Sequence, residues 1–178
     1  MHYATLQSHH TDAFISLFKE TFAASEGTNE GDMLRGLVKQ LLDTTEANAL
    51  FGFVAIENDQ VVGGVLFSRL ILSSHQNAFM LSPLAVHPSF QKQGVGQGLV
   101  CHALGELKAA EVSLVVTYGD PAFYQKVGFE ALSEDTLAAP HPLSQPIGWL
   151  AQTLDGSDIQ PTQGRCECVA AFNNPELW

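Results

Sequence analysis

The residues from Leu84 to Leu99 constrain the fold of this chain more than any other stretch. An apolar run ends at Val86, a short polar loop follows, and a helix pattern then opens with glycines at alternate positions, Gly94, Gly96 and Gly98. The free N–H groups of a helix start, together with the positive end of the helix dipole, bind anions without many cations. Since Lys92 is the only basic residue of this loop, the pattern predicts a strand–loop–helix unit that binds a diphosphate through its backbone.

Two other glycine loops do not fit these residues. A Walker A loop requires a Lys and then a Ser or Thr directly after its last glycine, and neither follows here. A Rossmann fingerprint requires G-x-G-x-x-G close to the strand end, whereas seven residues separate Val86 from Gly94. The loop is therefore neither a nucleotide P-loop nor a dinucleotide fingerprint.

Two amphipathic helix patterns follow a short strand that we expect at residues 3–6. In the first helix, apolar residues recur at helical spacing from Phe14 to Phe22, and Gly27 ends it. In the second, Asn29 is the expected N-cap and the apolar stripe runs over residues 33–42. Two such helices in succession predict that each buries one face against an apolar layer.

Strand patterns at residues 50–56, 61–72 and 78–86 supply that layer. The first two are apolar on both faces, which is typical of central strands, and Asn58-Asp59 between them predicts a hairpin turn. Pro83 cannot donate to a sheet ladder, so it predicts a bulge or a place where two strands part. A helix over 94–110, a strand over 112–118, a short helix between Asp120 and Gly128 and a strand over 129–132 complete a mixed-sheet α/β domain.

The last part of the chain is less regular. Three prolines within residues 136–148 predict a loop, and strands are expected over 149–154 and 166–172. We expect one domain over residues 1–178, with a core over 1–133 and a proline-containing loop and C-terminal strands over 134–178. Cys101 is expected in the core, and the cysteines are expected to be reduced structural thiols.

Charge and hydropathy exclude several kinds of partner. Asp and Glu number 19 against 8 Lys and Arg, a formal net charge of −11, which disfavours nucleic acid. No apolar run approaches the ~18 residues that span a bilayer, and the first residues lack a signal-peptide pattern. We therefore expect a cytoplasmic protein that has neither a membrane nor a nucleic-acid partner. The His9-His10 pair has no third ligand at usable spacing, so no metal is expected.

The segment Gln91-Lys92-Gln93-Gly94-Val95-Gly96 resembles the acetyl-coenzyme A (acetyl-CoA) signature of the GNAT-type N-acetyltransferases. It follows Leu84-Ala85-Val86-His87-Pro88, a strand end that this superfamily usually shows. Residues 119–129 are similar to the family's Tyr-x-x-x-Gly-Phe element, and their Gly-Asp-Pro start is similar to the YhbS-like branch. The resemblance covers residues 1–133 and implies a single-domain GNAT-like three-layer fold, a mixed central sheet with helices on both faces, and acetyl-CoA as co-substrate.

The resemblance also implies a role for each matching position. Main-chain groups of Leu84, Ala85 and Val86 would pair with the pantetheine arm, and the Val86 N–H would polarise the thioester carbonyl. Tyr124 would protonate the leaving thiolate. The diphosphate would be held by backbone N–H groups of Gln91, Lys92, Gly94, Val95, Gly96 and Gln97.

The acceptor and its base remain open at this point. The strand over 78–86 has no acidic residue where many relatives have a Glu, so Glu57, His75, His87 and Asp120 stay equal candidates for the general base. In the family, the region corresponding to residues 27–31 borders the acceptor pocket.

The predicted function is transfer of an acetyl group to a primary amine of a small molecule, and the acidic composition favours a cationic acceptor. A non-catalytic acetyl-CoA-binding sensor or interaction module is one alternative, and acetylation of protein N-termini or lysines is another. The oligomeric state is not fixed, and a homodimer is one option.

Overall fold

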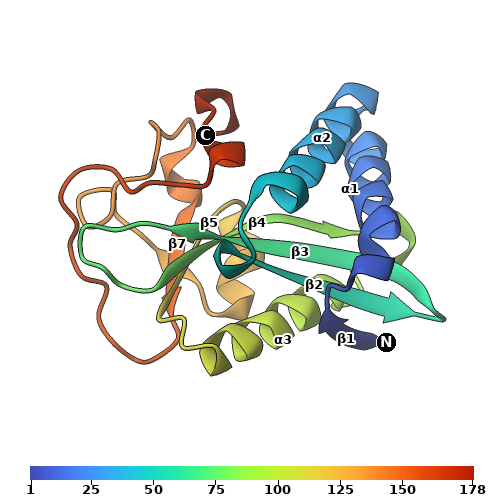
Figure 1. Ribbon diagram of the computed structural model, residues 1–178, viewed down its shortest axis with the longest axis horizontal. Coiled ribbons are helices and arrows are strands. Elements are labelled where there is room, and N and C mark those ends of the chain that lie inside the picture. The colour runs from blue at the N-terminus through green and yellow to red at the C-terminus, as the bar shows by residue number, and fades with distance from the viewer. The chain divides into compact units, whose positions relative to one another are not determined.

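The computed structural model describes residues 1–178 and contains a mixed seven-stranded sheet. The strands hydrogen-bond in the order β1-β2-β3-β4-β5-β7-β6; β4 and β5 are parallel, whereas β1–β2, β5–β7 and β6–β7 are antiparallel. Their bounds are β1 His2–Thr5, β2 Leu50–Glu57, β3 Gln60–Leu70, β4 Ala78–Val86, β5 Leu114–Tyr118, β6 Glu130–Ala131 and β7 Trp149–Thr153. The predicted α/β class and order of elements are confirmed (Figure 1).

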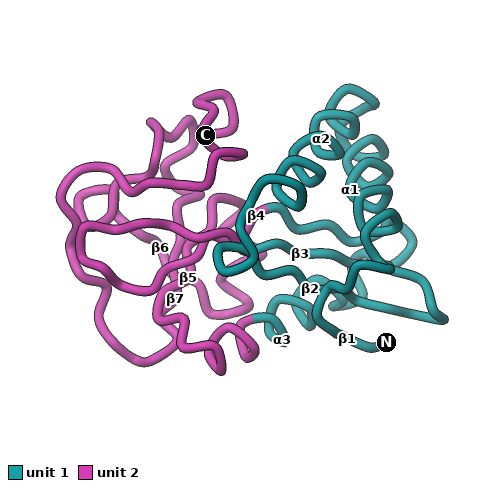
Figure 2. Tube along the Cα trace, in the orientation of Figure 1, with its two compact units in different colours: residues 1–67, 83–103 teal, residues 68–82, 104–178 magenta.

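The helices are α1 Thr11–Glu26, α2 Thr28–Thr44, α3 Val95–Ala109 and the short α4 Pro121–Tyr124. The chain forms two compact units, one of residues 1–67 and 83–103 and one of residues 68–82 and 104–178 (Figure 2). Strands β3 and β4 and helix α3 contribute residues to both units. The expected division of the chain at residue 133 stays a prediction.

In the first unit, helices cover both faces of the strands (Figure 1). Successive residues of a strand point to opposite faces. A Cβ built on Gly64 would lie within 3.1 Å of the rings of Phe14 and Phe18 on α1, and one built on Gly63 would lie 3.4 Å from Leu99 on α3. These glycines let both helices approach β3 closely, which gives the helix–sheet–helix layering expected from strands that are apolar on both sides.

The turn chemistry of the first unit mostly follows the sequence. Asn58 and Asp59 have φ of 49° and 62°, as the hairpin between β2 and β3 requires, and Gly27 separates α1 from α2 with φ of 103°. The expectation that Asn29 caps α2 is wrong, because the N-cap is Gly27 and Asn29 already lies inside the helix. The glycine's backbone freedom allows the two helices to follow each other almost directly.

The second unit is built around β5. One neighbour, β4, pairs with it over Ala78–Leu81, and the other, β7, pairs with it over its whole length. Trp149 of β7 is 1% exposed, and its indole Nε1–H donates to the Leu137 carbonyl at 2.9 Å. This bond fixes the chain after β6 against the sheet, and the predicted strand over 149–154 is confirmed.

The predicted strand over residues 166–172 is wrong. Glu167 makes an isolated antiparallel bridge with Ile71, and residues Ala170–Phe172 form a single 3₁₀ turn. Aromatic packing replaces a sheet ladder here, since Phe172 and Trp178 are buried and the Trp178 indole donates to the Phe172 carbonyl at 3.0 Å. Alternating apolar residues are therefore satisfied by a ring cluster rather than by strand pairing.

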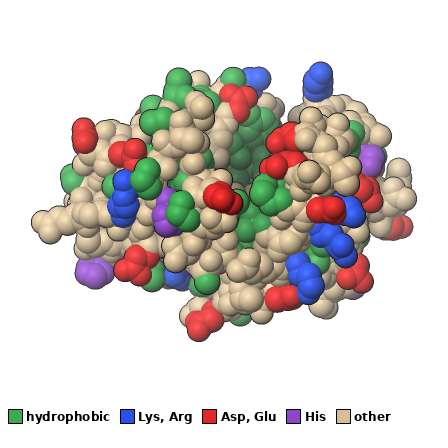
Figure 3. Space-filling view, turned by 90° about the horizontal axis from the view of Figure 1, so that it is seen from above, with side chains coloured by type: hydrophobic (Ala, Val, Ile, Leu, Met, Phe, Trp, Pro, Cys, Tyr) green, Lys and Arg blue, Asp and Glu red, His purple; other side chains and the backbone are tan.

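The exposure of one cysteine differs from what the sequence predicts. Cys101 is exposed on α3 rather than buried in the core, while Cys166 is buried. All three cysteines are free thiols. On the face shown in Figure 3, acidic and basic side chains are interspersed. No helix combines the length and the apolar composition needed to cross a membrane.

Candidate functional site

Strand β4 extends beyond the residues that pair with β5. The parallel register ends at Leu81↔Thr117, whereas β4 runs on to Val86. Pro83 lies two residues beyond the last pair and has no N–H to donate. Since β5 itself ends at Tyr118, the predicted parting of the strands stays a prediction.

The other edge of β4 fixes which peptide groups stay open. The His87 N–H donates to the Val62 carbonyl of β3 at 2.9 Å. Since backbone groups alternate between the two edges of an antiparallel strand, those of Leu84 and Val86 point away from β3, and those of Ala85 point toward it. The Leu84 groups and the Val86 N–H, rather than the groups of Ala85, therefore lie on the edge where an added strand would pair, whereas the Val86 carbonyl on that edge accepts a side-chain hydrogen bond.

The loop after β4 begins with a 3₁₀ turn at Pro88–Phe90. His87 caps this turn, because its Nδ1 accepts the Ser89 N–H at 3.3 Å. The Gln91 side chain folds back and donates to the Val86 carbonyl at 2.9 Å. Its own N–H donates to the Pro88 carbonyl at 3.3 Å. Gln91 therefore shapes the loop, and its N–H is less available to a diphosphate than the sequence suggests.

The first turn of α3 presents the open N–H groups. Gly94, with φ of 80°, lies directly before the helix, and Lys92 also has a positive φ of 60°. The first helical bond is from the Gly98 N–H to the Gly94 carbonyl at 2.9 Å. The N–H groups of Val95, Gly96 and Gln97 therefore have no backbone acceptor and carry the positive end of the helix dipole. This is the arrangement that the sequence predicts for an anion site.

Gly98, the third glycine of the motif, has a different structural role. A Cβ on Gly98 would lie 2.1 Å from the Tyr3 hydroxyl oxygen. Gly98 is thus a packing glycine that lets β1 approach α3, and it takes no part in the loop. Alternate spacing in the sequence does not separate this structural glycine from Gly94 and Gly96.

The second motif lies in the second unit and folds as a closed turn. The Asp120 carboxylate accepts the Ala122 N–H at 2.9 Å and begins α4, with Pro121 at its first position. The segment ends at Gly128, whose φ is 93°. The predicted cap, proline and terminating glycine are all confirmed.

Tyr124 is packed inside this turn. It is 9% exposed, and its ring lies edge-on to Phe123 and Phe129 at centroid distances of 5.0 and 5.5 Å. Burial raises the pKa of Tyr124 to about 12, the Thr117 hydroxyl opposes the rise, and the Asp120 charge adds to it. The phenol therefore stays protonated at neutral pH and can donate a hydrogen bond or a proton.

The candidate bases are mostly occupied by structural contacts. Glu57 pairs with the amino group of Met1, and Asp120 caps α4. His75 has φ of 58° and lies in a turn, where its N–H donates to the Leu72 carbonyl. His87 caps the loop turn. No contact singles out one of them, and the general base stays unassigned.

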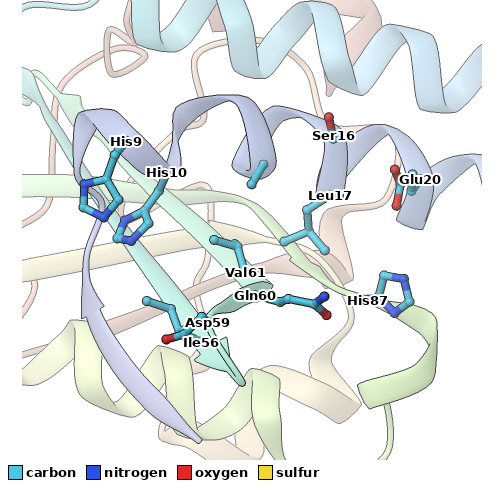
Figure 4. Close-up of a pocket in the computed structure, with 11 residues that line it drawn as sticks. His9, His10, Ser16, Leu17, Glu20, Ile56, Asp59, Gln60, Val61 and His87 are labelled. Carbon is cyan, nitrogen blue, oxygen red and sulfur yellow. The ribbon is translucent and has the colours of Figure 1, made fainter.

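Sequence reasoning missed a cavity beside α1. It has a volume of about 610 Å³ and is lined by residues of α1, the β2–β3 hairpin and His87 (Figure 4). Its one signal in the sequence was the His9-His10 pair, which was considered above only as a metal ligand pair. His9 is exposed, but His10 is half-buried, and both line the cavity.

Known proteins resemble the chain in sequence. Residues 48–131 match the family model described as "Acetyltransferase (GNAT) domain". The chain is 28% identical to the uncharacterized N-acetyltransferase YjhQ of Escherichia coli K12 over 139 residues, which are 75% of this chain and 76% of YjhQ. It is 37% identical to the uncharacterized N-acetyltransferase YhbS of the same strain over 94 residues, which are 52% of this chain and 53% of YhbS.

Solved structures resemble it in fold. YhbS from Escherichia coli in complex with CoA has a TM-score of 0.79 at 24% identity, covering 97% of this chain and 92% of that one. A GNAT family acetyltransferase from Brucella melitensis in complex with acetyl-CoA has a TM-score of 0.75 at 23% identity, covering 96% and 97%. At this identity the likeness shows the fold.

Proposed function

We propose that this chain, whose residues 48–131 match the GNAT acetyltransferase domain, is an N-acetyltransferase of the YhbS-like branch. It transfers an acetyl group from acetyl-CoA to a primary amine of a small molecule by direct attack. The observation that carries this proposal is the first turn of α3. There the N–H groups of Val95, Gly96 and Gln97 have no backbone acceptor, and Lys92 is the only Lys or Arg within residues 84–99. A diphosphate is an anion of the kind that helix N-termini bind.

The residues around that turn fit acetyl-CoA as co-substrate. Val95, Gly96 and Gln97 would donate to the diphosphate, with Lys92 and Gly94 shaping the approach and Gln91 holding the loop to Val86. Leu84 and Val86 would pair with the pantetheine arm along the edge of β4 beyond its β5 register. The solved relatives that hold CoA or acetyl-CoA support this choice of ligand.

The proposed reaction is one displacement with balanced atoms. The neutral amine nitrogen attacks the thioester carbonyl carbon, the C–N bond forms, and the C–S bond breaks. The nitrogen gives up one proton and the thiolate takes one, leaving an N-acetyl amine and free CoA. The Val86 N–H would donate to the carbonyl oxygen as it gains negative charge, a contribution typically worth about 3 kcal/mol.

Tyr124 would donate to the sulfur. A thiol has an ordinary pKa near 8.5, and the pKa of Tyr124 is raised to about 12. Full proton transfer to such a thiolate would be uphill by about 3 pKa units. We therefore assign Tyr124 the role of a hydrogen-bond donor to the leaving sulfur. Tyr124 keeps its proton, and the thiolate takes the proton that the amine releases.

The test is release of free thiol from acetyl-CoA in the presence of a panel of primary amines and lysine-containing peptides, with mass spectrometry of the products. The proposal expects at least one small amine to be acetylated with kcat/KM well above that of every peptide. Acetylation of peptides alone would overturn the small-molecule assignment. Binding of CoA without turnover on any acceptor would favour a sensor.

A further inference from the structure

The cavity beside α1 lies within the first unit and is separate from the proposed acetyl-CoA loop. Its volume of about 610 Å³ is within the range of small-molecule sites. None of the residues proposed to hold acetyl-CoA lines it. The connection between the two is His87, which lines the cavity with its side chain and begins the loop with its backbone.

The middle of the cavity is aliphatic. Leu17 of α1 faces Val61 of the β2–β3 hairpin across it (Figure 4), and Ala13 and Ile56 also line the cavity. Side chains of this kind bind methylene groups and exclude charged ones. Leu17 and Val61 therefore favour an aliphatic chain in the part of a guest that lies between α1 and the hairpin.

The ends of the cavity are polar and negatively charged. Figure 4 shows Glu20 and His87 toward one end, and His9, His10 and Asp59 toward the other. From His10, which directly precedes α1, to Glu20, the helix rises by about 15 Å. A carboxylate thus lies near each end of an elongated groove.

Neither carboxylate is neutralised by the protein. Glu20 and Asp59 form no ion pair, whereas Asp32 and Asp43 pair with Lys19 and Lys39. No Lys or Arg lines the cavity. Burial and the neighbouring His9 lower the pKa of His10, so this imidazole adds no positive charge at neutral pH. The cavity therefore favours a cationic guest.

We propose that this cavity is a second ligand site that binds a linear aliphatic diamine, with one ammonium group near Glu20 and the other near Asp59. The methylene chain lies over Leu17 and Val61, and the side-chain carbonyl of Gln60 accepts a remaining ammonium hydrogen. The chemistry selects two positive charges joined by an apolar chain, and it rejects monoamines and anions.

The test is isothermal titration calorimetry at low ionic strength with hexamethylenediamine, and with hexylamine as the matched monoamine. The diamine is expected to bind at least about tenfold more tightly, since one charge-assisted hydrogen bond is worth about that factor. Glu20→Gln and Asp59→Asn each weaken binding of the diamine by about five- to tenfold. Glu26→Gln, which removes a carboxylate of the same helix outside the cavity, leaves it unchanged.

Several results would contradict the second site. Equal affinities for diamine and monoamine, or a diamine affinity that both cavity variants leave intact, would exclude recognition by two carboxylates. Acetylation of the diamine that falls in parallel with its binding in both variants would make the cavity the acceptor pocket instead. CoA is expected to bind the wild type and both cavity variants with equal affinity. A wild-type protein that does not bind CoA would contradict the proposed function but not this second site.

Discussion

Two segments of this protein join a strand to a helix through short glycine-containing loops, and they differ in what their backbone groups do. In the loop of residues 87–97, the N–H groups of the first helical turn have no acceptor. In the turn of residues 119–129, the Asp120 carboxylate takes the first N–H and its carbonyl takes those of Phe123 and Tyr124. One segment is open to an anion, and the other is closed around a buried ring.

The difference shows what a loop needs in order to bind a ligand through its backbone. A side-chain cap stabilises a helix start by about 1 kcal/mol, but it uses the N–H that an anion would need. In the 87–97 loop, no side chain accepts a hydrogen bond from the first N–H groups of α3. The side chains of Gln91 and Gln93 instead donate to the carbonyls of Val86 and Ser89, which precede them in the chain. The loop is held in shape without closing its anion site.

Replacing the buried phenol tests the closed segment and has the largest expected effect. Tyr124→Phe keeps the ring packing but removes the donor, so kcat is expected to fall by about 10²-fold or more while the affinity for CoA is unchanged. Tyr118→Phe is the matched control, because its hydroxyl bonds to Ser144 and Gln145. The measurement is steady-state kinetics with an amine that the wild type acetylates. Equal kcat values for the two variants would show that Tyr124 has no part in the mechanism.

The raised pKa of Tyr124 predicts a loss of stability in alkali. The ordinary pKa is 10 and the folded one about 12, so the folded state keeps a proton that the unfolded state has released. The stabilisation is complete below pH about 10 and declines above it by about 1.4 kcal/mol per pH unit until about pH 12. Urea unfolding across this range should show the decline in wild type. In Tyr124→Phe the decline should be smaller, and identical slopes would contradict the burial of the phenol.

A methyl group at Gly94 tests the open segment. Alanine at a φ of 80° is strained by about 1–2 kcal/mol, and the loop can relieve this only by moving the N–H groups that follow. Gly94→Ala is therefore expected to weaken CoA binding by about tenfold in calorimetry. Gly105→Ala on the exposed face of α3, where a Cβ meets nothing, should leave CoA affinity unchanged and raise stability slightly.

Removing the one cation of the loop has the smallest expected effect. Lys92 is exposed, and an exposed charge contributes at most about 1 kcal/mol. Lys92→Asn, which tolerates the positive φ, should weaken CoA binding by less than about fivefold at physiological salt. A loss of about a hundredfold would mean that the side chain, rather than the backbone, holds the diphosphate.

Most of the fold could be predicted from the sequence because local signals agree with the tertiary packing. Apolar runs gave β2 to β4, the Asn58-Asp59 turn gave their hairpin, and Asp120-Pro121 gave the start of α4. The signals failed where packing overrides pattern. Residues 166–172 alternate like a strand, but Phe172 at their end packs against Trp178, and Cys101 is exposed on α3.

The site was predictable only as a linear motif. Spacing pointed to the residues of the loop, but it could not show that Gly98 packs against Tyr3 or that Gln91 uses its N–H internally. These are contacts with residues elsewhere in the chain or local bonds that depend on the loop's exact path. The cavity beside α1 could not be predicted from the His9-His10 pair alone, because the helix and the hairpin that line it are distant in sequence.

The central claim is that backbone N–H groups at the start of α3 bind the diphosphate of CoA. The direct measurement is a titration of ¹⁵N-labelled protein with CoA, followed through the amide resonances of Val95, Gly96 and Gln97, with pantetheine as the control that lacks the diphosphate. We predict that CoA shifts these three amides most and that pantetheine leaves them in place. CoA binding that leaves all three unshifted, or no binding at all, would contradict the account.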